Sequence, residues 1–390
     1  MAFSFSFAGD DIEDDGTQQQ QQPESNVVAG GGQDQGPRGG SSTSAFPVQG
    51  RAQLAAERHD LGRMLAQLPS RIAYGTLEVE AQGGGVTRLP RRELWDVRVQ
   101  LAAEDEGLTG GGGGGHDEAG LGQHDVRTGI YEGGFKSWES SVDLVKVLAR
   151  HDMSPALALA KGPVRMIELG CGTALPSLAV FQWAAALEEA ARSPLSLTLA
   201  DYNPSVLQLV TLPNFILAWA LLRRGESELL QEALSSEENL DGGGELELDD
   251  EVKAAFLSFL ETSNISLSFV SGGWSPAFVE LLYDGLGAPL QQQQQQGGNS
   301  SSTLVVGAET IYSPFALGAF ADTLLAVLRR ERSGGGGSAT SIVAAKRLYF
   351  GVGGSLDDFV DRVAGEGVDV RWLAEETEGV RRGVVQCSLP

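Results

Sequence analysis

Cysteine and histidine are scarce in this sequence, and their scarcity argues against several classes of site. The 390 residues include two cysteines and four histidines. Two cysteines build no disulfide framework, so we expect a reducing intracellular compartment. The histidines have no metal-ligand spacing with the cysteines, so we expect no metal centre. A phosphate-binding P-loop and a G-x-S-x-G nucleophile elbow are also absent, and the enzyme classes that depend on them are disfavoured.

Long apolar runs and positive charge are the other shortages. No apolar run is expected to span a membrane, and the N-terminal segment 1–7 lacks the basic region of a signal peptide. Lys and Arg number 28 against 52 acidic residues, a formal net charge of −24. This balance disfavours direct nucleic-acid binding, which needs basic side chains to replace counterions. The acidic excess serves either solubility and repulsion between tails or attraction to a basic partner, and charge alone does not choose.

Low-complexity sequence is abundant and divides the chain. Residues 1–57 combine an acidic run, a glutamine tract and a Gly/Ser/Pro-rich stretch, so we expect a disordered tail. Residues 58–125 form an N-terminal extension with a glycine-rich linker, and residues 126–390 form the main domain. Because longer loops add little closure entropy, the low-complexity insertions of the main domain are interpreted as surface loops without a direct role. They lie near 241–250, 290–302 and 333–340.

The main domain alternates strand patterns with helical patterns, which predicts an α/β fold with a mostly parallel sheet. The predicted strands cover 164–169, 196–200, 265–270, 303–308, 342–350, 368–373 and 381–388. The predicted helices cover 139–151, 177–191, 205–224, 250–261, 315–330 and 355–364. In the extension, the pattern indicates a helix over 59–67, a short strand over 72–79 and another element over 94–101.

The turn after the first of these strands is the most informative motif. Glu168, Gly170 and Gly172 form an E-x-G-x-G sequence between a strand and a helix, and the next strand ends at Asp201. Such a turn, with an acid that can accept hydrogen bonds from ribose hydroxyls, predicts a pocket for a nucleoside-containing cofactor. Leu175 replaces the third glycine of the dinucleotide fingerprint, which favours a cofactor without pyrophosphate. The alternative is a glycine turn that binds nothing.

Aromatic and polar residues accompany other element ends. Trp138 belongs either to a lid over the cofactor or to an entry turn that packs a helix against the sheet. Trp274, after the third strand, flanks an adenine ring or packs in the core. Asn203 lines the polar rim of the pocket, begins a helix before Pro204, or does both.

The remaining motifs lie later in the chain or inside a helix. Glu309 and Tyr312 follow the fourth strand, where unpaired burial would be costly, so a polar site is the better hypothesis. The glycines of 349–354 form a close-fitting substrate loop or simply a turn. Pro213 falls inside a helical pattern and predicts a kink whose role is core packing.

Taken in order, these motifs resemble those of the histidine protein methyltransferases. The motifs that carry the resemblance are Y-E-G-G-F-K-S-W-E at 131–139, E-L-G-C-G at 168–172, D-Y-N at 201–203, V-T-L-P-N at 210–214, E-T-I-Y at 309–312 and Y-F-G-V-G-G at 349–354. The similarity covers 126–390 apart from the insertions. It implies a Rossmann-like seven-strand methyltransferase sheet, mostly parallel, with one antiparallel strand at the C-terminal end.

The resemblance also implies an activity, which is S-adenosyl-L-methionine-dependent methylation of one histidine of a basic large-subunit ribosomal protein. We expect a monomer of the cytoplasm and nucleus. Glu309 and Tyr312 are the candidates for orienting the imidazole. The implied cofactor contacts are Lys136, Ser137, Trp138, Glu139, Ser140, Glu168, Gly170, Gly172, Asp201, Tyr202, Asn203, Gly272, Gly273, Trp274 and Ala308.

Two departures and two alternatives accompany this prediction. The family often has serine where this chain has Ala308 and an acid where it has Gly273, so neither position supplies a side-chain hydrogen bond here. One alternative is a lysine methyltransferase of the same fold. The other is a non-catalytic module that binds a ribosomal protein.

Overall fold

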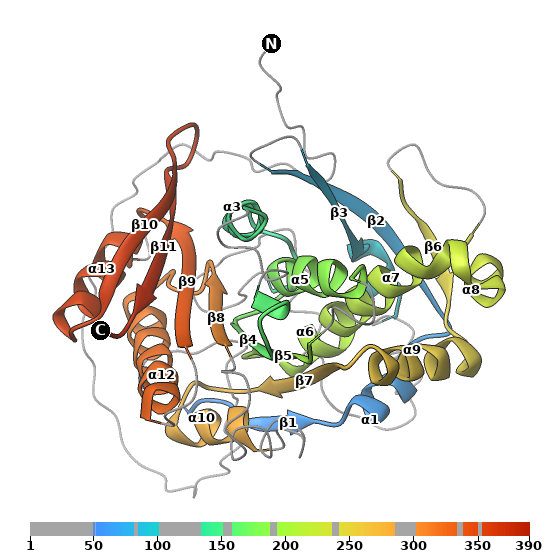
Figure 1. The fold of residues 1–390 in the computed structure, drawn as a ribbon, viewed down its shortest axis with the longest axis horizontal. Helices are drawn as coiled ribbons and strands as arrows, with labels where there is room; N and C mark the ends of the chain where they lie inside the picture. The colour runs from blue at the N-terminus through green and yellow to red at the C-terminus, as the bar shows by residue number, and fades with distance from the viewer. Residues whose placement is uncertain are drawn as a thin grey trace, which may run out of the picture. The chain divides into compact units, whose positions relative to one another are not determined.

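A mixed sheet forms the centre of the computed structural model (Figure 1). Among the described residues it contains eight strands in the order β1-β7-β5-β4-β8-β9-β11-β10. These are β1 (Glu57–His59), β7 (Ile265–Ser271), β5 (Leu195–Asp201), β4 (Val164–Leu169), β8 (Ser302–Ala308), β9 (Ser338–Lys346), β11 (Arg382–Ser388) and β10 (Asp369–Glu376). The five strands from β7 to β9 are parallel, whereas β1 and β11 run antiparallel to their neighbours. The predicted α/β fold with a mostly parallel sheet is confirmed.

The structure describes most of the chain after residue 49. The described residues are 50, 52–81, 85–100, 134–150, 158–187, 193–235, 242–284, 302–333, 338–349 and 353–390. Several predictions lie outside them: most of the 1–57 tail, the glycine-rich linker, the Y-E-G start of the 131–139 motif, residues 350–352 of the last motif, and most of the insertion at 290–302.

Helices cover both faces of the sheet because its central strands are apolar on both sides. In β4, successive residues Met166 and Ile167 enter different core clusters, as the alternation of a strand requires. One cluster includes residues of α3 (Glu139–Leu148), α5 (Leu175–Ala185), α7 (Leu212–Arg223) and α9 (Asp250–Thr262). The other includes residues of α10 (Pro276–Tyr283), α12 (Pro314–Ser333) and α13 (Leu356–Gly365) (Figure 1).

The helical run after β5 is longer and more apolar than we expected of any segment of this chain. Pro204–Glu226 is long and apolar enough to cross a membrane by length and composition alone. Its most apolar window is 78% buried inside the protein, so packing accounts for its composition. The run comprises α6 (Pro204–Val206), a π-helical turn η3 (Leu207–Thr211), α7 and η4 (Arg224–Glu226). The kink that we predicted near Pro213 corresponds to this π-helical turn. The proline itself lies in the first turn of α7.

The described residues between 52 and 100 belong to the same compact unit as the main domain. Strand β1 extends the large sheet to eight strands, where we expected seven, and α1 (Leu61–Ala66) begins later than predicted because 57–59 pair with β7. A second sheet, of three strands among the described residues, has the order β3-β2-β6. It contains β3 (Val86–Arg92), β2 (Arg71–Glu80) and β6 (Gly244–Glu247).

The segment at 241–250 corrects the loop interpretation. Residues 244–247 form β6, which pairs with β2, and Leu246 has no exposed surface. Asp249 then caps α9 by accepting a hydrogen bond from the Val252 N–H at 2.8 Å. The acidic composition hid two buried leucines, Leu246 and Leu248, and a helix cap, so the described part of this insertion is packed structure.

Other helices and strands also differ from the predicted ones. The strand predicted over 342–350 runs from Ser338 to Lys346, because residues 338–340 pair with β8. These residues belong to the predicted 333–340 insertion, so its end is strand and not surface loop. The short helices α8 (Glu228–Ala233) and α10 were not predicted, although Ser275 and Pro276 form a normal helix start. Residues 94–100 are helical, which defines the element expected there.

The packing of β6 gives a stability prediction. Leu246→Ala should lower the free energy of unfolding by about 2–5 kcal/mol, because it leaves a cavity between the second sheet and the core. Glu247→Ala is the control on the same strand, since its side chain is 65% exposed; the expected change is within about 0.5 kcal/mol. Urea unfolding measures both, and a small effect of Leu246→Ala would contradict the burial of β6.

Candidate functional site

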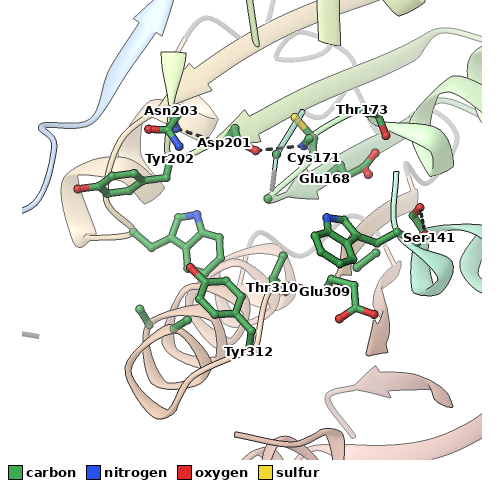
Figure 2. Close-up of a pocket in the computed structure, with 18 of the residues that line it drawn as sticks. Ser141, Glu168, Cys171, Thr173, Asp201, Tyr202, Asn203, Glu309, Thr310 and Tyr312 are labelled. Carbon is green, nitrogen blue, oxygen red and sulfur yellow. Dashed lines mark hydrogen bonds between the residues drawn. The ribbon is translucent and has the colours of Figure 1, made fainter. Parts of the chain in front are cut away.

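A pocket opens at the carboxyl ends of β4, β5 and β8 (Figure 2). Parallel α/β sheets bind ligands at this edge because the loops that follow the strands meet there. Predicted site residues that line it are Lys136, Trp138, Glu168, Gly170, Gly172, Asp201, Tyr202, Asn203, Trp274, Ala308, Glu309 and Tyr312. The tertiary structure thus brings residues from five separate motifs to one cavity.

The glycine turn has a left-handed backbone. Gly170 has φ 69° and Gly172 has φ 51°, a region that other residues adopt at a cost. A Cβ on Gly170 would collide with the Thr310 side chain, and one on Gly172 would lie 3.1 Å from the Gly134 carbonyl oxygen. These glycines therefore let neighbouring walls of the pocket pack against the turn.

Asp201 holds this turn in place. Its Oδ2 accepts a hydrogen bond from the Gly172 N–H at 3.0 Å, and its Oδ1 accepts one from the Asn203 N–H at 3.1 Å (Figure 2). Burial raises the pKa of the carboxyl to about 6, and the backbone N–H groups lower it in part. The carboxylate thus lines the pocket and also joins the ends of β4 and β5.

Glu168 lies deeper and serves the start of α5. Its Oε2 accepts hydrogen bonds from the Ser177 N–H at 3.1 Å and from the Ser177 hydroxyl. Burial raises the pKa of Glu168 to about 8, and the nearby Asp201 adds to the rise. The acid of the E-x-G-x-G motif therefore anchors the helix behind the glycine turn.

The π-turn and the first turn of α7 also support the glycine turn. The Thr211 hydroxyl donates to the Gly172 carbonyl oxygen at 2.7 Å, and the Asn214 amide donates to the Thr173 carbonyl oxygen at 3.0 Å. Sequence reasoning assigned V-T-L-P-N only to core packing and missed this role. Two hydrogen-bonding side chains in an apolar helix were the signal that could have shown it.

Glu309 is the centre of a polar cluster, which we call the Glu309 cluster: Ser140, Glu309, Lys346 and Tyr349. The Glu309 carboxylate accepts hydrogen bonds from the Ser140 and Tyr349 hydroxyls. Burial raises its pKa, which the positive charge of Lys346 partly offsets. Glu309 also has φ 58°, a strained backbone for a residue with a side chain. Tyr349 was absent from our predicted site residues, although its motif had been recognised.

Trp138, Trp274 and Tyr312 surround the same cavity. Trp138 lies in the pocket wall with Lys346 Nζ 5.2 Å from its ring, and it is the residue directly before α3. This position is compatible with the lid and with the entry turn. Trp274 lines the pocket and packs against Phe320 with ring centroids 5.6 Å apart, so it lies between the cavity and the core. Figure 2 shows the Tyr312 ring and the Glu309 carboxylate pointing in different directions. The Tyr312 hydroxyl has no hydrogen-bond partner among the described residues.

Five predicted cofactor contacts lie outside the pocket lining: Ser137, Glu139, Ser140, Gly272 and Gly273. Ser137 is within 3.0 Å of the Thr173 hydroxyl, and Ser140 is part of the Glu309 cluster. The two glycines are covered by residues 52–56, because a Cβ on Gly272 would collide with the Ala55 carbonyl group. In the same way, a Cβ on Gly273 would lie 2.8 Å from the Gln53 Cβ, and Gln53 itself lines the pocket.

The fold and the pocket define a class, the α/β proteins with a cofactor-type pocket at the carboxyl edge of a parallel sheet. Comparison with known proteins narrows it. The chain is 35% identical over 278 residues to histidine protein methyltransferase 1 of Saccharomyces cerevisiae, covering 70% of this chain and 67% of the relative. The corresponding protein of Schizosaccharomyces pombe is 30% identical over 337 residues and 85% of both chains. The chain belongs to the histidine protein methyltransferase family, and the predicted resemblance is confirmed.

Other comparisons add less. A Rattus norvegicus homologue of histidine protein methyltransferase 1 is 27% identical over 266 residues, covering 68% of this chain and 59% of the relative. No protein-family model matches the chain. Among solved structures, a methyltransferase from Pyrococcus furiosus aligns with 75% of this chain and 95% of its own, at 10% identity and a TM-score of 0.29.

The raised pKa of Glu168 predicts a pH-dependent stability. Between its unfolded value near 4.3 and its folded value of about 8, the folded state holds a proton that the unfolded state has lost. This contribution to the free energy of unfolding is therefore lost as pH rises through 8. Glu168→Gln keeps an acceptor for Ser177 and cannot ionise, so its melting temperature should fall less between pH 5 and pH 8.5.

Thermal unfolding of wild type and Glu168→Gln across that pH range measures the difference. Glu247→Gln, an exposed position, is the matched control and should follow the wild-type curve. Parallel curves for Glu168→Gln and wild type would contradict a buried, neutral Glu168.

Proposed function

We propose that this protein transfers the methyl group of S-adenosyl-L-methionine to a ring nitrogen of a protein histidine. The observation that carries the proposal is the acidic lining of the pocket. Glu168, Asp201 and Glu309 all line it, and burial raises the pKa of each. A cationic ligand would stabilise their ionised forms, whereas a pyrophosphate-bearing cofactor would disfavour them.

The residues of the pocket fit such a cofactor. The Asp201 carboxylate accepts backbone hydrogen bonds from Gly172, Asn203 and Tyr202. Its two oxygens offer about four acceptor sites, so a site remains for a ribose hydroxyl. Trp274 Nε1 and Thr310 Oγ1 are buried without a partner among the described residues, and both residues line the pocket. Unpaired buried donors are costly, so a polar ligand that reaches them would be favoured. Phe315, Ala316 and Ala319 of α12 add an apolar wall for a base or a thioether.

The chemistry required of the protein is alignment. When bound, S-adenosyl-L-methionine supplies an electrophilic methyl group on a sulfonium centre. The side chains of the pocket must hold a substrate imidazole in line with it and exclude water. Free histidine, with a pKa of about 6.5, is mostly neutral at cytosolic pH and keeps a lone pair on one nitrogen. After transfer, the ring proton of the product imidazolium passes to solvent.

Tyr312 and Glu309 have different roles in orienting that imidazole. The Tyr312 hydroxyl lines the pocket and is available to bond a substrate nitrogen. The Glu309 carboxylate is already held by Ser140 and Tyr349, so it acts as a positioning residue. Its strained backbone begins the turn that carries Tyr312 to the cavity.

The proposal extends to the sheet. We assign the seven strands β7, β5, β4, β8, β9, β11 and β10 to the methyltransferase sheet, with β11 as its antiparallel strand and β1 as an addition. The strand order and the antiparallel pairing of β11 on both sides support this assignment.

The proposed substrate is a histidine of a basic large-subunit ribosomal protein. The net charge of −24 supports it, because electrostatic attraction would favour encounter with a basic protein. We further propose that the enzyme acts as a monomer in the cytoplasm and nucleus, where such a substrate is synthesised and assembled.

Incubation with purified basic ribosomal proteins and isotope-labelled cofactor tests the function. Mass spectrometry of the product should locate the label on histidine. Methyl-lysine without methyl-histidine would favour the lysine methyltransferase alternative. Binding of a ribosomal protein without cofactor binding by calorimetry would favour the non-catalytic module.

Substitution of the two orienting residues makes the mechanism testable. Tyr312→Phe should lower kcat about 10- to 100-fold, the value of one hydrogen bond of 1.4–2.8 kcal/mol in the transition state. Glu309→Gln should lower kcat and also the melting temperature, because one of its two hydroxyl partners loses an acceptor. Tyr283→Phe, on α10 and outside the pocket, is the matched control and should keep wild-type kcat.

Steady-state kinetics with identification of the methylated nitrogen measures these effects. An unchanged rate and an unchanged nitrogen in both Tyr312→Phe and Glu309→Gln would remove these residues from the mechanism.

A further inference from the structure

We infer that Gln53 contacts the base of the bound cofactor and selects adenine. The inference rests on the proposed function, because it assumes a nucleoside cofactor in this pocket. Gln53 belongs to residues 52–56, a segment before β1 that sequence reasoning placed outside the methyltransferase domain. The side chain lines the same pocket as Asp201, Tyr202 and Trp274.

The segment 52–56 is fixed to the ends of two strands. The Leu54 N–H donates to the Tyr202 hydroxyl at 3.0 Å, just after β5. The Leu54 carbonyl oxygen accepts from the Gly273 N–H at 2.9 Å, just after β7. Residues 57–59 then pair with β7 as β1. These bonds hold Gln53 at the edge of the pocket independently of any ligand.

The two glycines after β7 leave the space that residues 53–55 occupy. Gly272 has φ 103°, and a Cβ there would collide with the Ala55 carbonyl group. A Cβ on Gly273 would lie 2.8 Å from the Gln53 Cβ. The side chain that enters the pocket wall next to Trp274 therefore comes from position 53 instead of from the loop after β7.

The chemistry of Gln53 matches the proposed neighbour. An acid at the end of the second parallel strand is suited to ribose hydroxyls, so Asp201 marks the sugar. The base then lies beyond it, toward Tyr202, Trp274 and Gln53. A carboxamide carries a donor and an acceptor side by side, which pairs with the N6 amino group and N7 of adenine. With an oxo group in place of that amino group, both positions of the base are acceptors, so no orientation of the carboxamide makes both hydrogen bonds.

Calorimetric titration of the full chain tests the inference without measuring turnover. The ligands are S-adenosylhomocysteine and S-inosylhomocysteine, which differ in the amino group of the base. Gln53→Ala should bind S-adenosylhomocysteine about 3- to 10-fold more weakly, and its preference for adenine over hypoxanthine should fall by a similar factor. Gln53→Met retains the length of the side chain without its amide and should behave like Gln53→Ala.

Controls separate binding from folding. Glu57→Gln is a matched polar substitution on the adjacent strand, exposed and outside the pocket lining, and should keep wild-type affinity and preference. The melting temperature of the ligand-free variants should stay at the wild-type value. If Gln53→Ala lowers the melting temperature, the affinity and base preference of Gln53→Met test the inference in its place.

The outcomes distinguish the two proposals. Wild-type affinity and wild-type preference in Gln53→Met would overturn the role of Gln53 and leave the methyltransferase proposal intact. Failure of the wild-type protein to bind S-adenosylhomocysteine would overturn the proposed function and this inference with it.

Discussion

The hydrogen bond from the Gly172 N–H to the Asp201 carboxylate is the interaction on which the site depends. It joins the turn after β4 to the end of β5, and a second bond to the Asn203 N–H fixes the carboxylate itself. A buried carboxylate needs such donors, because unpaired burial of charge is expensive. Thr211 adds a third contact to the same turn through the Gly172 carbonyl oxygen. The cavity is therefore shaped by the protein before any ligand arrives.

Charge and strain are concentrated around that cavity. Glu168 and Asp201 lie on one side of it, and the Glu309 cluster lies on another. Burial raises the pKa values of all three carboxyl groups. A cation bound in the pocket would therefore favour their ionised forms. The positive φ of Glu309 persists because Ser140 and Tyr349 hold its side chain in place. Perturbed pKa values and a strained backbone at one cleft are typical of functional sites.

Much of the fold was predictable from sequence because its signals are local. The strands β4, β5, β7 and β8 were located to within one residue at each end, since each is a short apolar run bounded by polar residues. Two strands that the sequence did not predict depend on pairing with residues far away along the chain. β1 and β6 are short, and they are strands because distant partners complete their hydrogen bonds. β3 pairs with the preceding strand β2, but its charged sequence contains no apolar run that would predict a strand. An acidic segment such as 244–247 has no local signal that would predict a strand.

By itself, the sequence determined the α/β class, the family and the motifs that reach the pocket, because periodicity and short motifs are properties of neighbouring residues. Only the tertiary structure decided how these motifs meet. It paired Ser140 and Tyr349 with Glu309 across 169 and 40 residues of chain. It also covered Gly272 and Gly273 with 52–56 and brought Gln53 to the pocket. Such contacts depend on the packing of whole elements, and spacing along the chain carries no record of them.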